Sequence, residues 1–158
     1  MKNIKVRFAV FCLLVIAVVA LPVQSPVFKK NYDNFTTYYF FAKTINHKNP
    51  NAKYVKNGNA YVVSCKFEDA KEVKNGLFDV LGESIKVKNY SQTTKNDILK
   101  RFENLVVSMQ FVDKYVVLQC YDKSLENYLI VDGKKVNIQI ALTDAEINIG
   151  YPLILNGF

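Results

Sequence analysis

The residues of this sequence best suited to chemistry are its cysteines. Cys65 and Cys120 each lie in a short apolar run, and the alternation of a strand directs both thiols toward the core. A catalytic cysteine needs an exposed, electropositive setting beside a histidine, which these positions do not offer. Two interpretations stay open for the pair: a disulfide, worth roughly 3 to 4 kcal/mol for a loop of this length, or two buried free thiols.

The other candidates for catalysis are the single histidine and the acidic residues. His47 lies in an Asn-rich and Lys-rich stretch without a neighbouring Cys, Asp or Glu, so neither a zinc site nor a Ser-His-Asp triad has its ligands nearby. We interpret it as a surface loop residue. The acidic residues are sparse, and the sequence contains no phosphate-binding, dinucleotide-binding, calcium-binding or nucleophile-elbow motif. The sequence therefore predicts a protein that is not an enzyme, with no catalytic residue, metal, cofactor or small-molecule substrate.

A run of aromatic residues is the candidate partner surface. Such side chains supply large apolar contact areas to a protein or carbohydrate. They also favour strands, in which they pack in the core more often than they contact a partner. The run consists of Tyr38, Tyr39, Phe40 and Phe41.

The first 25 residues have the pattern of a membrane-targeting segment. Lys2, Lys5 and Arg7 precede an uninterrupted apolar run, Phe8–Val23, as in a signal peptide or a signal anchor. The run is at or just below the roughly 17 to 25 residues of a spanning helix, so cleavage after Ala20 and retention both stay open, with retention favoured. If the segment is retained, the positive-inside rule places Lys2, Lys5 and Arg7 in the cytoplasm and the following residues outside it. We expect a membrane-anchored chain facing the extracytoplasmic side, or a secreted one.

The net charge of +7 does not indicate a nucleic-acid partner. Lys2, Lys5 and Arg7 supply three of these charges, and the remaining lysines are scattered along the chain. Nucleic-acid modules concentrate basic and aromatic groups on one surface. We therefore expect a solvated basic surface, and the membrane and an unknown protein or envelope component as the partners.

Apolar periodicity predicts one domain over residues 35–158, after a linker over residues 26–34. Helical spacing of apolar residues predicts a helix from Ala70 to Leu81 that stops at Gly82, with Gly76 marking either close packing or a weak helix. A second helix is expected after a capping box at Thr94.

Alternating and β-branched runs between turn signals predict at least six strands. We expect an α+β fold: a mostly antiparallel sheet with two helices packed on one face, preceded by the N-terminal hydrophobic helix. The last strands are expected to continue as an antiparallel meander. The predicted strands are 35–45, 61–67, 84–88, 106–112, 115–121, 128–131, 135–142 and 146–149.

The closing segment is the most distinctive part of the sequence. Residues Asp132–Ala141 and Ile149–Ile154 resemble the tail of the YwmB-like exported proteins of spore-forming, low-GC Gram-positive bacteria. The resemblance covers about the last third of the chain. It implies an extracytoplasmic domain whose fold is similar to the TATA-box-binding protein, without an established activity or catalytic residues.

Three functional hypotheses follow from the sequence. The first is a non-enzymatic, membrane-tethered interaction module of the cell envelope that offers its sheet or an exposed edge strand to a partner. The second is a secreted inhibitor or ligand-binding protein that uses the aromatic run. The third, a cell-wall hydrolase, is disfavoured because the acidic residues and His47 form no recognisable constellation.

Overall fold

The computed structural model describes residues 37–155. The predictions of a targeting segment over residues 1–25 and of a linker over 26–34 lie outside the described residues. Within residues 37–155 no helix is long enough and apolar enough to span a bilayer.

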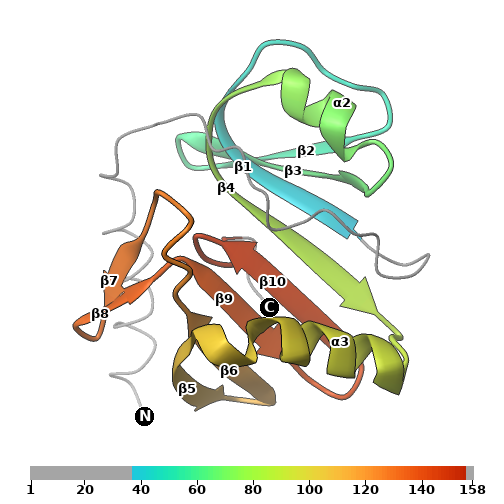
Figure 1. Ribbon diagram of the computed structural model, residues 1–158. Coiled ribbons are helices and arrows are strands. Elements are labelled where there is room, and N and C mark those ends of the chain that lie inside the picture. The colour runs from blue at the N-terminus through green and yellow to red at the C-terminus, as the bar shows by residue number, and fades with distance from the viewer. Residues whose placement is uncertain (1–36, 156–158) are drawn as a thin grey trace.

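An eight-stranded sheet forms the centre of the described residues (Figure 1). Its strand order is β2-β3-β1-β4-β10-β9-β6-β5, and every neighbouring pair is antiparallel. The prediction of an α+β fold with a mostly antiparallel sheet is thereby confirmed. Its strands are β1 (Thr37–Ile45), β2 (Lys53–Asn57), β3 (Ala60–Lys66), β4 (Leu77–Lys88), β5 (Val106–Val112), β6 (Tyr115–Cys120), β9 (Ile138–Leu142) and β10 (Glu146–Tyr151).

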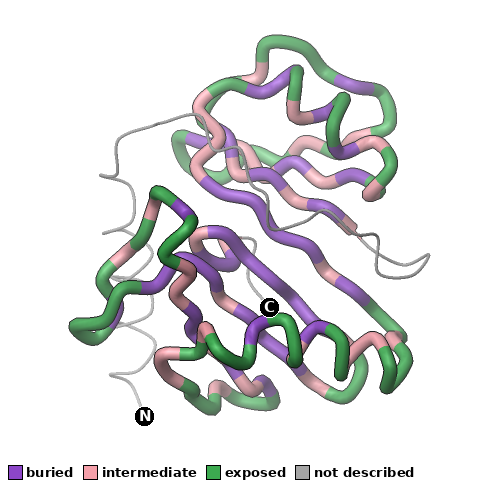
Figure 2. Tube along the Cα trace, viewed as in Figure 1, coloured by how far each residue is buried: buried purple, intermediate pink, exposed green. Residues whose placement is uncertain are grey.

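Both α-helices of the described residues contribute to one core on one face of the sheet, here called the helix face. Val73 of α2 (Ala70–Asn75) and Ile98 of α3 (Gln92–Phe102) belong to the same buried cluster as Ile85 and Ile149 of the sheet. The two isoleucines are direct cross-strand partners, so their side chains share a face. Figure 2 shows that the buried residues concentrate along the central strands β4 and β10.

The opposite face, here called the tail face, is also covered in its C-terminal half. After Tyr151 the chain turns back, and Ile154 packs with Tyr115, Val117 and Ala141 of the sheet. A side chain on Gly150 could not be accommodated, because its Cβ would lie 2.3 Å from the backbone nitrogen of Ile154.

A separate hairpin packs beside this tail. It is formed by β7 (Leu129–Val131) and β8 (Lys134–Val136). Its Val131 and Val136 are buried together with Leu153. These elements make the tail face a second, smaller packed layer.

The predicted helix over residues 70–81 is wrong in its second half. The helix α2 ends at Asn75, and residues 77–88 form β4, the longest strand of the described residues. Helical spacing of the apolar residues in 70–81 is overridden because β4 pairs with β1 on one side and with β10 on the other.

Gly76 marks the transition from α2 to β4, and close packing is the reason for a glycine there. The backbone N–H groups of Asn46 and His47 both donate to the carbonyl oxygen of Gly76, over 2.9 and 3.1 Å. A Cβ at this position would lie 2.3 Å from the carbonyl oxygen of His47. Of the two interpretations of Gly76, close packing is therefore confirmed.

Three smaller differences come from local hydrogen bonding and pairing. The cap of α3 is Ser91, whose hydroxyl accepts from the backbone N–H of Thr94 over 3.1 Å, so the predicted cap lies three residues too late. The strand β2 was not predicted, because only Tyr54 and Val55 are apolar among its lysines. The predicted meander is interrupted, since β7 and β8 pair with each other and only β9 and β10 join the main sheet.

Substitution of Gly76 by alanine should destabilise the fold by about 1 to 3 kcal/mol, the usual cost of overpacking. The φ of Gly76 is −85°, so the cost arises from the contact with His47 and not from backbone strain. Urea denaturation of Gly76→Ala measures it, with the neighbouring exposed Asn75→Ala as a control that should stay within about 0.5 kcal/mol of the parent. Equal stability of the two variants would contradict the packing role of Gly76.

Candidate functional site

The structure does not bring the two predicted core cysteines together. Cys65 lies on β3 and Cys120 on β6, with β1, β4, β10 and β9 between them. The strands are therefore about 24 Å apart, since neighbouring strands lie about 4.8 Å from each other. Both thiols are free and buried, and burial raises the pKa of Cys65 and of Cys120 to about 12. Neither is a nucleophile near neutral pH.

The aromatic run is divided between the two faces of β1. Tyr38 and Phe40 are buried on the helix face and stack with ring centroids 4.8 Å apart. Tyr39 and Phe41 alternate to the tail face and are half-buried. The four side chains therefore form no single partner surface on β1. His47 is exposed in a loop. Residues 37–155 contain no group of three or more His, Cys, Asp or Glu side chains that could hold a metal ion.

A buried carboxylate that sequence reasoning missed lies in the helix-face core. Glu83 of β4 accepts a hydrogen bond from the hydroxyl of Tyr38 over 2.5 Å and forms an ion pair with Lys74 of α2. Its side chain is only 1% exposed, so an unpaired charge here would cost several kcal/mol. Burial, and then the charge of Glu83, raise the pKa of Tyr38, which stays protonated. Both carboxylate oxygens are bound by protein groups, which is the arrangement of a structural ion pair.

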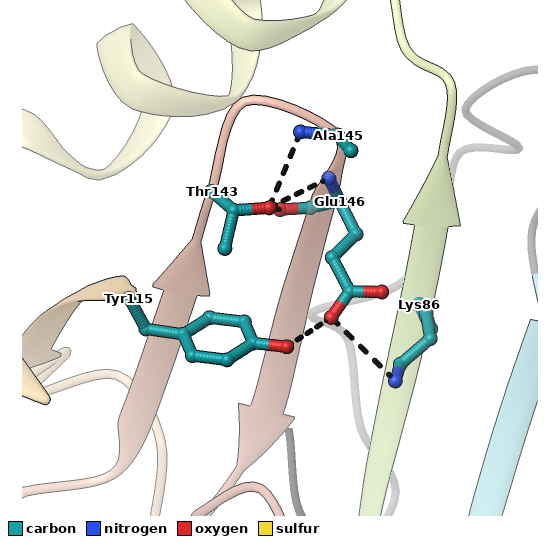
Figure 3. Close-up of polar contacts among 5 residues, drawn as sticks. All are labelled: Lys86, Tyr115, Thr143, Ala145 and Glu146. Atoms are coloured by element: carbon teal, nitrogen blue, oxygen red, sulfur yellow. Dashed lines mark hydrogen bonds and ion pairs between the residues drawn. The ribbon is translucent and has the colours of Figure 1, made fainter. Parts of the chain in front are cut away.

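A second polar cluster lies on the tail face, where side chains of β4, β10 and β6 converge although β9 separates the last two strands (Figure 3). The hydroxyl of Tyr115 on β6 donates to Oε1 of Glu146 on β10, and the amine of Lys86 on β4 lies 3.9 Å from the same oxygen. The hydroxyl of Thr143 accepts from the backbone N–H groups of Ala145 and Glu146 over 3.2 and 3.1 Å, which fixes the turn before β10. The turn thus presents the carboxylate between the tyrosine and the lysine.

The electrostatics of this cluster hold its groups in fixed protonation states. The hydrogen bond from Tyr115, opposed by partial burial and helped by Lys86, lowers the pKa of Glu146. The same hydrogen bond raises the pKa of Tyr115 to about 12. Because the acid stays ionised and the phenol stays protonated at neutral pH, neither is suited to general acid–base catalysis. What the cluster can do is tie β4, β6 and β10 together.

Asn148 is the least satisfied polar residue of this region. Its side chain is buried on β10, two residues after Glu146 and on the same face of the strand. Neither its amide nitrogen nor its amide oxygen makes a hydrogen bond of standard geometry. A buried amide without partners costs about 1 to 3 kcal/mol. No sequence signal distinguishes it from the many surface asparagines.

A solvent-open hollow lies at the end of β1. Its lining includes two lysines and no acidic residue. No buried polar side chain points into it, so it offers a ligand only solvated charges. It is lined by Lys43, Thr44, Ile45, Asn46, Lys48 and Tyr61.

The two edges of the sheet differ in a way that bears on partner binding. Native edge strands are commonly protected by lysines, and β2 at one edge carries Lys53 and Lys56. The strand β5 at the other edge, VVSMQFV, carries no charge. Its Met109 and Phe111 lie on the helix face and are 57% and 76% exposed. We call Val106–Val112 the β5 edge, and it is the candidate interaction site of the described residues.

Comparison of the chain with models of protein families, with curated proteins and with solved structures finds no match in any of the three. Met109 and Phe111 were not singled out from the sequence. The signal available for them was a strand pattern without a single charge before the Asp113-Lys114 turn.

Substitution of Tyr115 by phenylalanine should lower the free energy of unfolding at pH 7 by about 1 to 2 kcal/mol, because Glu146 loses its main donor. The folded-state pKa of Glu146 lies below the ordinary value of 4.5, so this stabilisation is present above pH 4.5 and is lost as the pH falls through the folded-state pKa. The difference between parent and Tyr115→Phe in urea denaturation should therefore narrow toward pH 3. In a Glu146→Gln background the pH dependence of that stability difference should disappear. If the pH dependence persists there, a titratable group other than Glu146 causes it.

Substitution of Asn148 by leucine should stabilise the fold by about 1 to 2 kcal/mol, because it replaces an unsatisfied buried amide by an apolar group of similar shape. Gln119 is the matched contrast, since it is equally buried but accepts a hydrogen bond from the hydroxyl of Ser108 over 2.5 Å. Gln119→Met should therefore destabilise. Chemical denaturation of both variants checks the pair, and a loss of stability in Asn148→Leu would show that the amide has a partner in solution.

Proposed function

We propose that this protein is a non-enzymatic interaction module of the cell envelope, anchored to the membrane by its N-terminal segment and facing the extracytoplasmic side. Its partner adds a strand at the β5 edge. The observation that carries the proposal is the exposure of Met109 and Phe111 on an edge strand without charge.

The extracytoplasmic placement is supported by the sequence alone. The basic residues and apolar run of residues 1–25 are the pattern of an export signal or anchor. The similarity of residues Asp132–Ala141 and Ile149–Ile154 to the YwmB-like exported proteins agrees with that location. Retention of the segment distinguishes the tethered module from a secreted binding protein.

The mode of binding follows from the physics of an open sheet edge. A strand added at an edge gains main-chain hydrogen bonds, while alternate side chains provide the specificity. Met109 and Phe111 are two residues apart and thus project from the same face of β5. An extended partner segment can form backbone hydrogen bonds with β5 and cover these two side chains at the same time. Methionine is a flexible apolar side chain and phenylalanine a planar one, and both types are enriched at the centres of interfaces.

The proposal predicts site-specific cross-linking in the intact host. A photoreactive phenylalanine analogue at position 111 of the full-length chain should give a discrete cross-linked product. The same analogue at Phe78, which is 58% exposed on β4, is the matched control and should give none. Equal products from the two positions, or none from position 111, would contradict the β5 edge as the partner site.

Fractionation of the same cells tests the location. The full-length mass should be found in the membrane fraction, accessible to protease added outside. A released form that begins near Leu21 would instead favour the secreted binding protein, and recovery from the cytosol would overturn both.

A further inference from the structure

The hydrogen-bonding pattern of the β5–β6 hairpin shows which backbone groups of the β5 edge face outward. Val112 and Tyr115 close the two-residue turn, and Gln110 and Ser108 follow as the partners of Val117 and Gln119. In an antiparallel ladder alternate residues exchange hydrogen bonds with one neighbour. The backbone N–H of Tyr121 also bonds toward this side, to the carbonyl oxygen of Leu105, which fits the alternation. The backbone groups of Met109 and Phe111 therefore point away from β6.

We propose that the occupant of the β5 edge is a second copy of this chain, paired antiparallel through β5 about a two-fold axis at Gln110. This inference rests on the proposed function and names its partner. The two sheets then join into one continuous sheet across the interface.

The register follows from the positions of the outward-facing residues. Only an axis at Gln110 pairs Met109 of each copy with Phe111 of the other, so that both outward residues exchange hydrogen bonds. An axis at Met109 would pair Phe111 of each copy with Val107 of the other. The β5–β6 pairing is irregular at Val107, and its carbonyl oxygen already accepts a hydrogen bond from the amine of Lys134 over 2.8 Å. An axis at Phe111 would pair Met109 of each copy with Asp113 of the other, and Asp113 belongs to the turn and not to β5. Direct opposition of an aromatic ring and a methionine is a favourable cross-strand contact.

The charges around the β5 edge fit this register. It places Asp113 of one copy beside Val107 of the other, where the amine of Lys134 lies. By symmetry this acid–lysine contact occurs twice. The side-chain amide of Gln110 donates a hydrogen bond to Asp132 over 3.2 Å on the tail face. Met109 and Phe111 on the helix face stay uncovered by this contact. The corresponding pairing of two β2 strands would instead bring Lys53 and Lys56 of two copies together.

Cysteine cross-linking of the full-length chain in its native membranes tests this register. Opposed residues of a non-hydrogen-bonded pair have Cα atoms about 4.5 Å apart, which a disulfide can bridge. Under mild oxidation Gln110→Cys should give a covalent dimer with twice the mass of the chain. Ser108→Cys alone should not, because the two sulfurs would be about 13 Å apart along the strand. The double variant Ser108→Cys/Val112→Cys should again give the dimer, since these two positions face each other between copies.

The parent chain, which keeps Cys12, Cys65 and Cys120, is oxidised alongside as the background. Dimers from Gln110→Cys and from the double variant, above this background and without a dimer from Ser108→Cys, would establish the pairing. Absence of a dimer from Gln110→Cys overturns it. If the photoreactive residue at position 111 then still captures a different protein, the interaction module stands and only the second copy is wrong; if it captures nothing, both proposals fail.

Discussion

The fold depends on the pairing of β4 along both of its sides. This strand hydrogen-bonds to β1 on one side and to β10 on the other, and it is the only direct link in the sheet between the strands before α3 and those after it. The strands before α3 therefore share one eight-stranded sheet with β5, β6, β9 and β10, instead of the two groups forming two small sheets, each of which would bury too little apolar surface to be stable. The buried Glu83 lies on the same strand, so the ion pair with Lys74 and the hydrogen bond from Tyr38 anchor α2 and β1 to this link.

The sequence was sufficient for the class of fold and for most elements, because those elements have local signals. The stripe of α3 and the turn at Asp113-Lys114 can be recognised without knowledge of the rest of the chain. The interval from Ala70 to Leu81 cannot, since its apolar spacing fits a helix while its pairing partners, β1 and β10, lie far away in sequence. Non-local hydrogen bonds decided that interval, and no window of the sequence contains them.

The sequence could predict that an exposed edge strand is the candidate site, but not that this strand is β5. An exposed edge strand was among the sequence hypotheses, yet strand order decides which strand lies at an edge, and strand order is a property of the whole sheet. The polar residues of the tail face illustrate the same limit. Ser84, Gln119 and Asn148 have the composition of a solvated face, but they are buried because strand pairing places them in the interior of this face. The aromatic run of β1 was recognised as conspicuous, while its division between two faces follows directly from strand alternation.

Because Cys65 and Cys120 lie in different halves of the sheet, the two buried thiols can report on the opening of each half separately. Cys65 lies among the strands before α3 and Cys120 among those after it, and both are shielded and protonated near neutral pH. A thiol reagent reaches such a group only when the surrounding structure opens. The rate at which each cysteine is modified thus reports the opening of its own half of the sheet. The unaltered chain contains a matched pair of internal probes that distinguish unfolding as a single cooperative unit from separate opening of the two halves.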